Sequence, residues 1–102
     1  MDDSDVVKDK GIVRARADTI TILYFARLKE AFGRASERLA LPQSVDTVAA
    51  LRDHLRARGG AWEAELAVTK PVRVALNQEI TAPGARLSPG DEVAFFPPVT
   101  GG

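Results

Sequence analysis

The longest helical pattern in the chain, TVAALRDHLRARGG (residues 47–60), lies between two groups of strand-like segments. Its apolar residues recur at spacings of three and four and share one helix face: Val48, Leu51 and Leu55. Thr47 is a suitable N-cap, and Gly59-Gly60 is expected to end the helix. The charged residues are expected on the solvent side: Arg52, Asp53, Arg56 and Arg58. One such helix can cover one face of one sheet, which limits the folds open to this chain.

The segment before this helix predicts two strands. TITILYFAR (residues 19–27) is rich in β-branched and aromatic residues, and its alternation divides it between two faces. One face carries Ile20, Ile22 and Tyr24, and the other carries Thr21, Leu23 and Phe25. LKEAFG predicts a helical turn or two that Gly33 ends, and SERLAL (36–41) predicts a second strand. Because the link is so short, we expect the two strands to be antiparallel.

The segment after the helix predicts the rest of the sheet. AWEAEL is a short helical piece that lays Trp62 and Leu66 over an edge of the core. VRVALN (72–77) is a third strand, followed by a turn and a short segment around Ile80. LSPGDEV contains a turn at Pro89-Gly90, and EVAFF (92–96) is the last strand, with Val93 and Phe95 facing inward.

This order, β-β-α-β-β, predicts an α+β fold: a β-grasp, ubiquitin-like roll in which a mixed sheet of about four or five strands packs on one main helix. A chain of 102 residues is long enough for one domain. We expect a flexible N-terminal extension at residues 1–18, the β-grasp domain at 19–96 and an extended, flexible tail at 97–102.

Composition excludes several classes of function. Fourteen Lys and Arg residues balance fourteen Asp and Glu residues, which argues against nucleic acid as a partner. Without an apolar run of membrane-spanning length or a signal-like start, we expect no membrane partner and a cytoplasmic location. The chain has no cysteine, hence no thiol nucleophile or zinc–thiolate site. The single histidine, His54, is expected to be a solvated helix residue, and we expect no metal site.

The last six residues, PPVTGG, differ from an ordinary polar terminus. Pro97 and Pro98 cannot continue a sheet ladder and favour an extended conformation. Fully extended, the segment from Pro97 to Gly102 would span about 20 Å. Gly101 and Gly102 have no side chains, so this end of the chain fits a narrow channel. The reactive group it could deliver there is the carboxylate of Gly102.

DEVAFFPPVTGG closely resembles the C-terminal signature of the small subunit of molybdopterin synthase, the MoaD-type sulfur carriers. ILYFARLKEAFG is similar to that family's first strand and following helix, TVAALRDHL to its central helix, and VALNQE to its third strand and turn. The resemblance covers residues 19–102. The first 18 residues fall outside it, as an extension or a misassigned start.

The resemblance implies a chemistry for the tail. An E1-like enzyme would use ATP to adenylate the carboxylate of Gly102, and sulfur delivered to the activated carbonyl would give a thiocarboxylate. The tail would then donate sulfur to cyclic pyranopterin monophosphate in the active site of a large subunit, in a heterotetramer of two small and two large subunits. No cofactor would be bound permanently, and the acid–base residues would belong to the large subunit, so this chain would be a sulfur-donating subunit of an enzyme complex.

The resemblance also assigns roles by position. Gly102 would carry sulfur, Gly101 would give the narrow approach, and four residues would hold and guide the tail: Pro97, Pro98, Val99 and Thr100. Phe96 is the main candidate for contact with the large subunit if Phe95 points inward. Leu23 and Phe25 extend an apolar docking patch or belong to a two-sided core. Lys29 and Arg27 are basic residues that meet acidic groups on a partner or remain solvated.

Other readings of the same features stay open. Sulfur carriers for thiamine synthesis or tRNA thiolation share the β-grasp fold and the diglycine end. A ubiquitin-like protein modifier would instead join Gly102 to a lysine in an isopeptide bond. A pure interaction module would tolerate removal of the two glycines.

Overall fold

The structure is a computed structural model that describes residues 18–98 of the chain. Residues 1–17 and 99–102 lie outside the described residues, and with them most of the expected extension and the tail positions Val99, Thr100, Gly101 and Gly102. The elements, in chain order, are β1 (Thr19–Tyr24), α2 (Arg27–Phe32), β2 (Ser36–Ala40), α3 (Val48–Arg56), α4 (Gly60–Glu65), β3 (Arg73–Leu76), β4 (Glu79–Ile80) and β5 (Glu92–Phe96). No helix in this part of the chain is long and apolar enough to span a membrane.

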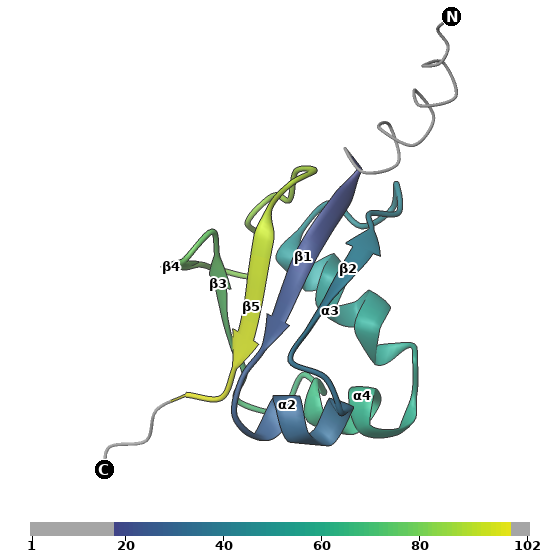
Figure 1. The fold of residues 1–102 in the computed structure, drawn as a ribbon, viewed down its shortest axis with the longest axis vertical. Helices are drawn as coiled ribbons and strands as arrows, with labels where there is room; N and C mark the ends of the chain where they lie inside the picture. The colour runs from purple at the N-terminus through teal and green to yellow at the C-terminus, as the bar shows by residue number, and fades with distance from the viewer. Residues whose placement is uncertain (1–17, 99–102) are drawn as a thin grey trace, which may run out of the picture.

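The five strands form one mixed sheet in the order β2-β1-β5-β3-β4 (Figure 1). The central strands β1 and β5 are parallel, and the other neighbouring pairs are antiparallel, including the predicted pair β1–β2. Strands β1 and β5 stand at opposite ends of the sequence, so the chain between them, including α3, crosses over one face of the sheet. The predicted α+β roll of the β-grasp type is confirmed.

The alternation predicted for the first and last strands is also confirmed. Ile20, Ile22 and Tyr24 of β1 are buried on the helix side of the sheet. Val93 and Phe95 of β5 face the same side and are fully buried. We call this side the inner face. The alternate residues of both strands form the outer face, which helices α2, α3 and α4 do not cover (Figure 1).

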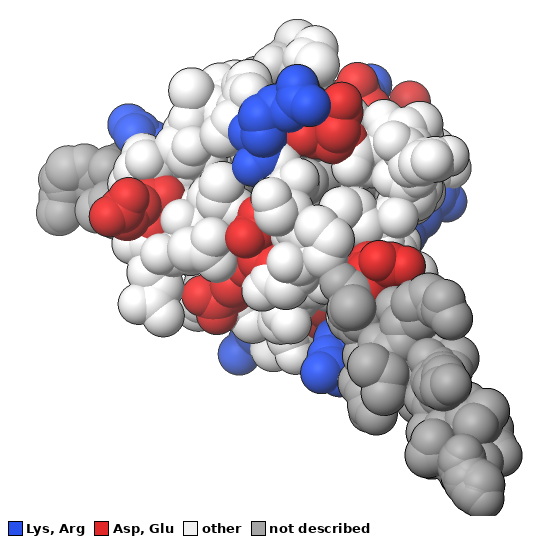
Figure 2. Space-filling view, turned by 90° about the horizontal axis from the view of Figure 1, so that it is seen from above, with Lys and Arg blue, Asp and Glu red and all other residues white. Residues whose placement is uncertain are grey.

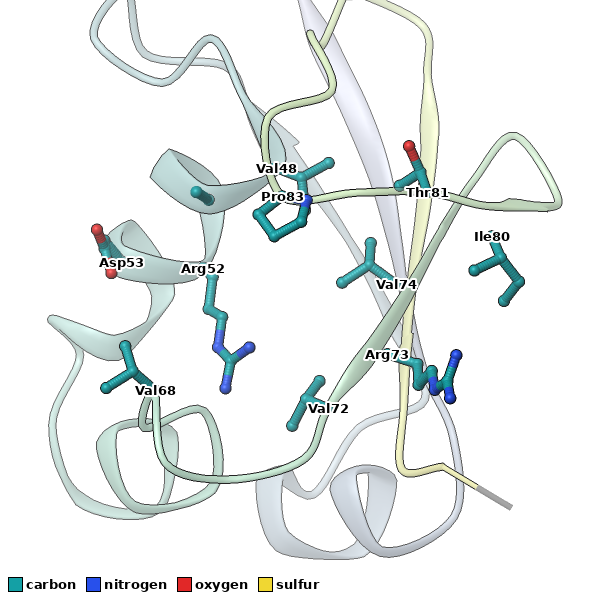
Figure 3. A pocket seen from close by; sticks show the side chains of 11 residues that line it. Val48, Arg52, Asp53, Val68, Val72, Arg73, Val74, Ile80, Thr81 and Pro83 are labelled. Atoms are coloured by element: carbon teal, nitrogen blue, oxygen red, sulfur yellow. The ribbon is translucent and has the colours of Figure 1, made fainter. Parts of the chain in front are cut away.

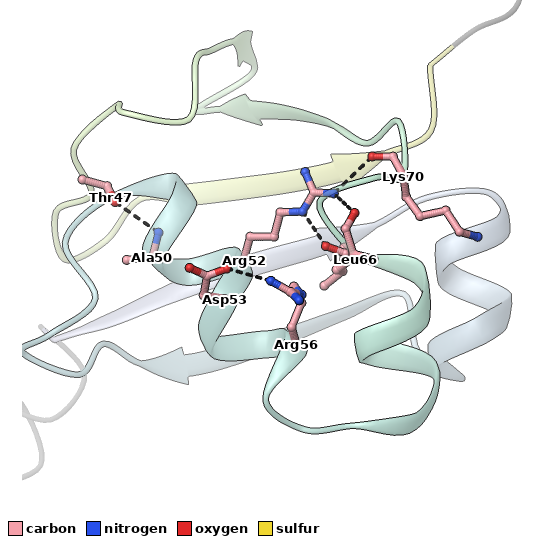
Figure 4. Close-up of polar contacts among 8 residues, drawn as sticks. Thr47, Ala50, Arg52, Asp53, Arg56, Leu66 and Lys70 are labelled. Carbon is pink, nitrogen blue, oxygen red and sulfur yellow. Dashed lines mark hydrogen bonds and ion pairs between the residues drawn. The ribbon is translucent and has the colours of Figure 1, made fainter.

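Helix α3 is the element that seals the inner face. The hydroxyl of Thr47 accepts a hydrogen bond from the Ala50 amide at 3.1 Å, as the predicted N-cap should (Figure 4). The three apolar residues of the predicted stripe are buried: Val48, Leu51 and Leu55. The predicted end of this helix is wrong, because α3 ends at Arg56 and Gly59-Gly60 start α4. Both glycines have positive φ, which serves the turn between the helices.

The prediction that Arg52 lies on the solvent side is wrong as well. Its Nε donates to the carbonyl of Leu66 at 2.7 Å, and its Nη2 donates to the carbonyls of Ala67 and Lys70 at 2.6 and 3.2 Å (Figure 4). Burial lowers the pKa of the guanidinium, although it remains a cation at neutral pH. Arg52 therefore fastens the segment after α4 to α3. A helix-period pattern could not reveal this, because the acceptors are backbone carbonyls.

An aromatic cluster closes the end of the core between α2 and α4. Trp62 stacks on Phe32 with ring centroids 3.9 Å apart and an interplanar angle of 8°. The guanidinium carbon of Arg58 also lies over the Trp62 ring, 4.4 Å from its centre. Leu66, which was predicted at an edge, is fully buried. Arg58, which was expected on the wet face of the helix, follows α3 and belongs to this cluster.

Candidate functional site

The outer face carries a row of small and apolar residues that runs across the sheet. Leu23 of β1 is paired with Ala94 of β5, Ala94 with Ala75 of β3, and Ala75 with Ile80 of β4. Directly paired residues have side chains on the same face of a sheet, so these four lie side by side. Ile80 is 61% exposed, and Leu23, Ala75 and Ala94 are half-buried.

A second group lies where β5 leads into the tail. Arg73 of β3 is paired with Phe96 of β5, and the amide of Phe25 donates to the carbonyl of Phe95 at 3.1 Å. Phe25 is 48% exposed and Phe96 is half-buried. Because Phe95 points inward as predicted, Phe96 lies on the outer face. We use the name docking face for the two groups together: Leu23, Phe25, Arg73, Ala75, Ile80, Ala94 and Phe96.

A strained turn holds Phe25 at this place. Ala26 has φ 55° and ψ −130°, a conformation that usually requires glycine, and the Leu28 amide donates to the carbonyl of Phe25 at 3.1 Å. These values describe a type II′ turn with alanine at its first central position. The turn ends β1 abruptly and begins α2, so Phe25 stays beside the end of β5 and is not carried into the helix.

The tail starts from the docking face. Pro97 and Pro98 follow Phe96 directly, are half-buried, and belong to no strand. The positions predicted to carry and guide sulfur, Val99 to Gly102, continue from there outside the described residues. Any partner that held the docking face would therefore have the start of the tail next to it.

The two basic residues proposed for partner contact differ from each other. Arg27 donates through Nε to Glu65 at 3.1 Å and so ties α2 to α4. Lys29 is exposed on α2. Arg27 thus has a structural role that the sequence did not reveal, while the role of both residues in partner contact stays a prediction.

Tyr24 and Glu37 support the docking face from the inner side. The Tyr24 hydroxyl donates to Glu37, which also accepts two hydrogen bonds from the Arg58 guanidinium at 2.8 and 3.0 Å. Burial raises the pKa of Tyr24 well above its usual range, and the neighbouring Glu37 adds to the rise. Burial alone would raise the pKa of Glu37, but the hydrogen bonds from Arg58 and Tyr24 outweigh it and lower the pKa. Strands β1 and β2 are thereby locked to the aromatic cluster.

Within residues 18–98, no group of three or more His, Cys, Asp or Glu side chains is placed to hold a metal ion. His54 is half-buried on α3, on the opposite side of the sheet from the docking face. Acidic and basic side chains are interspersed on the end of the molecule seen in Figure 2, which shows no broad basic patch.

The sequence prediction missed Arg73, Ala75, Ile80 and Ala94 as parts of the docking face. Strand β4 has only two residues, too few for an alternation that would place Ile80 on a face. Arg73 joins the face through its pairing with Phe96, which depends on the register of β3 against β5. Register between distant segments is a tertiary property, so no local pattern contains it.

Comparison with known proteins agrees with this geometry. The ThiS family model matches residues 22–102. The molybdopterin synthase sulfur carrier subunit of Escherichia coli is 41% identical over 83 residues, which are 81% of this chain and 99% of that protein. The subunit of the same name from Haemophilus influenzae is 37% identical over 81% of this chain and 99% of its own length. The crystal structure of SAMP1 from Haloferax volcanii has a TM-score of 0.67 at 30% identity and covers 82% of this chain and 99% of that one. The chain therefore belongs to the ThiS family, and it resembles the sulfur carrier subunits of molybdopterin synthase over nearly their whole length.

Proposed function

We propose that this chain is the sulfur carrier subunit of molybdopterin synthase. The observation that carries the proposal is the likeness to relatives of this name, and the ThiS family match over residues 22–102 includes the diglycine end as well as the folded domain. Two of these relatives are 41% and 37% identical to the chain and are matched along 99% of their length. The docking face, which leads directly into Pro97 and Pro98, supports a role in which the tail enters a partner.

The proposed chemistry takes place at the carboxylate of Gly102. A carboxylate is a poor electrophile, so an E1-like enzyme first transfers AMP from ATP to it and releases pyrophosphate. Hydrosulfide sulfur attacks the acyl carbon, AMP leaves, and a glycyl thiocarboxylate results. If the donor is a protein persulfide, its outer sulfur attacks to give an acyl disulfide, and a thiol of the donor then cleaves the S–S bond, which releases the thiocarboxylate and leaves the donor as a disulfide. This thiocarboxylate sulfur is the atom donated to cyclic pyranopterin monophosphate. The chain contains no cysteine, so a persulfide on this chain cannot hold the sulfur.

The large subunit would supply the catalytic side chains. We propose that it binds the docking face through Phe25 and Phe96 and receives Val99 to Gly102 in a channel. Two small and two large subunits would form the complete enzyme. Glycines at positions 101 and 102 suit a narrow channel because they present no side chains to its walls.

Removal of Gly102 tests the proposal. The last strand, β5, ends at Phe96, six residues before Gly102, so we expect the shortened chain to keep its thermal unfolding temperature. Sulfur transfer in a reaction with the E1-like enzyme, ATP, a sulfur source and the large subunit should be abolished. Full conversion of the pterin by the shortened chain would refute a mechanism at the Gly102 carboxylate.

A second candidate function is a ubiquitin-like protein modifier. It is favoured by the likeness to SAMP1, a small archaeal modifier protein by name, at 30% identity. A modifier would form an amide bond between Gly102 and a lysine of another protein. The two functions separate in one experiment: a modifier gives conjugates of higher mass after activation, whereas a sulfur carrier gives a free chain with sulfur at its end.

A further inference from the structure

A groove of about 430 Å³ lies on the helix side of the sheet, between α3 and the β3–β4 edge (Figure 3). Arg52 reaches into it from α3, and Val72 and Val74 face it from the chain at β3. Its apolar lining consists mainly of Val48, Val68, Val72, Val74, Ile80 and Pro83. The volume and the apolar walls are those of a site that takes a few side chains of a ligand or partner.

Exposed apolar side chains gather at the rim of this groove. Three large hydrophobic side chains are exposed in residues 18–98, namely Phe25, Val68 and Ile80, and the last two line the groove. Val68 is 74% exposed. A single exposed valine or isoleucine needs no explanation, but two at one apolar hollow are typical of an interaction surface.

The groove is continuous with the docking face. Ile80 is paired with Ala75 on the outer face and also lines the groove. Arg73 also belongs to both surfaces: it is paired with Phe96 on the outer face, and it lines the groove from β3. Strand β4, with its two residues, is the only element of the described chain at this edge of the sheet. One partner can therefore contact the docking face, strand β4 and the groove on the helix side as a single continuous surface.

Some charged side chains of the groove already form hydrogen bonds or ion pairs within the chain, and one does not take part in an ion pair among the described residues. Arg52 donates to three backbone carbonyls, and Asp53 is paired with Arg56 at 3.1 Å. Arg73 is exposed and takes part in none of the ion pairs found among residues 18–98. In Figure 3 its guanidinium lies across β3 from Arg52, toward Ile80. The cation available to an incoming group thus sits where the docking face and the groove meet.

We propose that the large subunit, once docked on the outer face, also inserts an apolar segment into this groove, with a carboxylate opposite Arg73. The identity of the partner rests on the proposed function. A segment of a protein that is already docked acts at a high effective concentration, so even a shallow groove contributes to affinity. The result is a clasp around the β3–β4 edge, which fixes the rotation of the small subunit and thereby the direction in which the tail leaves.

The test is isothermal titration of the full chain and its variants with the purified large subunit. Val68→Asp places a charge at the rim of the groove, and Ala64→Asp places the same charge on an exposed helix position outside it. We expect Val68→Asp to raise the Kd at least tenfold and Ala64→Asp to change it less than twofold. Both positions are exposed, so neither variant should alter thermal unfolding substantially.

A second pair of variants tests the charge. Arg73→Glu should raise the Kd at least tenfold in low salt and by less at high ionic strength, where a partly exposed ion pair is screened. Arg86→Glu makes the same change at a position that is 78% exposed and does not line the groove, and it should bind like the unaltered chain.

Phe96→Ala separates failure of this inference from failure of the proposed function. If Phe96→Ala weakens binding while Val68→Asp binds as tightly as Ala64→Asp, the large subunit does not enter the groove and the inference is overturned. Weakening by Arg73→Glu without weakening by Val68→Asp overturns it too, because the interface would then end on the outer face. If Phe96→Ala, Val68→Asp and Arg73→Glu all bind like the unaltered chain, the docking face itself is not the interface, and the proposed docking mode falls with the inference.

Discussion

Both faces of the sheet carry apolar residues along β1 and β5, but only those of the inner face are sealed from solvent, and the outer face also carries Thr21 and Glu92. On the inner face, Ile22, Val93 and Phe95 have no exposed surface, because α3 and the aromatic cluster cover them. On the outer face, their sequence neighbours Leu23 and Ala94 are only half-buried, and the described chain places no helix over them (Figure 1). A chain with one main helix can seal one face, and the other is left for a second protein.

Apolar residues on the two faces therefore lose their contact with water at different stages. Inner-face residues lose their contact with water when the chain folds, so they determine the stability of the domain. Outer-face residues keep much of that contact until a partner arrives, so they should contribute little to folding and much to association. The comparison can be tested by altering adjacent residues of one strand.

Ile22 and Leu23 are such a pair on β1, and we expect their alanine variants to differ strongly in stability. Ile22→Ala should lower the free energy of unfolding by about 2–5 kcal/mol, because it leaves a cavity in a closed core. Leu23→Ala, one residue further on, should lower it by less than about 1.5 kcal/mol and should weaken binding of the large subunit. Urea denaturation and titration calorimetry give the two quantities. Equal losses of stability in the two variants would contradict the division between the faces.

The next effect concerns the polar edge of the inner face. Glu37 is paired with Ile22 across β1 and β2, so it lies on the inner side, where it accepts hydrogen bonds from Tyr24 and Arg58. Glu37→Gln should lower the free energy of unfolding by about 1.5–3 kcal/mol at pH 7, the range for a hydrogen bond to a charged group. Glu63→Gln on the exposed surface of α4 is the matched control.

This variant also has a defined pH dependence. The pKa of Glu37 is lower in the folded state than its ordinary value of 4.5. Its stabilising contribution is therefore complete above the unfolded pKa and is lost as the pH falls through the folded one. When urea denaturation is repeated from pH 7 to pH 3, the stability gap between the unaltered chain and Glu37→Gln should stay constant down to about pH 5 and narrow below it. A gap that stays constant over this range would show that the carboxylate charge is not what Tyr24 and Arg58 bind.

A smaller effect, a gain in stability, is expected at the turn that joins β1 to α2. Ala26 adopts a conformation natural to glycine, so Ala26→Gly should raise the free energy of unfolding by about 1 kcal/mol. Ala49→Gly, in an exposed position of α3, should lower it by about 0.5–1 kcal/mol. Thermal denaturation of both variants checks the opposite signs. A loss of stability in Ala26→Gly would mean that the turn is not strained.

Much of the fold could be predicted because its signals are local. The period of two in β1 and β5, the stripe on α3, the cap at Thr47 and the stop at Gly33 are each contained in a few residues, and each is confirmed. The end of α3 was misplaced because Gly59-Gly60 reads equally well as a helix stop or as the entry to α4. Arg52 and Arg58 were assigned to solvent because their acceptors, Leu66 and Glu37, are 14 and 21 residues away.

The candidate site divides in the same way. Phe96 was predicted from its alternation with Phe95, and the structure places it on the outer face. Arg73 and Ile80 could not be predicted, because they join the docking face only through the register of three strands. The role of Val99 to Gly102 comes from the resemblance of the tail and stays a prediction.

Mass spectrometry of the C-terminal tryptic peptide can show whether the carboxylate of Gly102 carries sulfur. Arg86 is the last tryptic site in the sequence, so cleavage releases residues 87–102, which contain no methionine. Incubation with the E1-like enzyme, ATP and a sulfur source should raise the mass of this peptide by about 16 Da, a difference that elsewhere could be confused with methionine oxidation. Fragmentation should place the added mass on Gly102. After treatment with an alkylating reagent, the mass of the alkyl group should be found on the same residue. An unchanged peptide, under conditions in which the Escherichia coli carrier is converted, would refute the transfer of sulfur to Gly102.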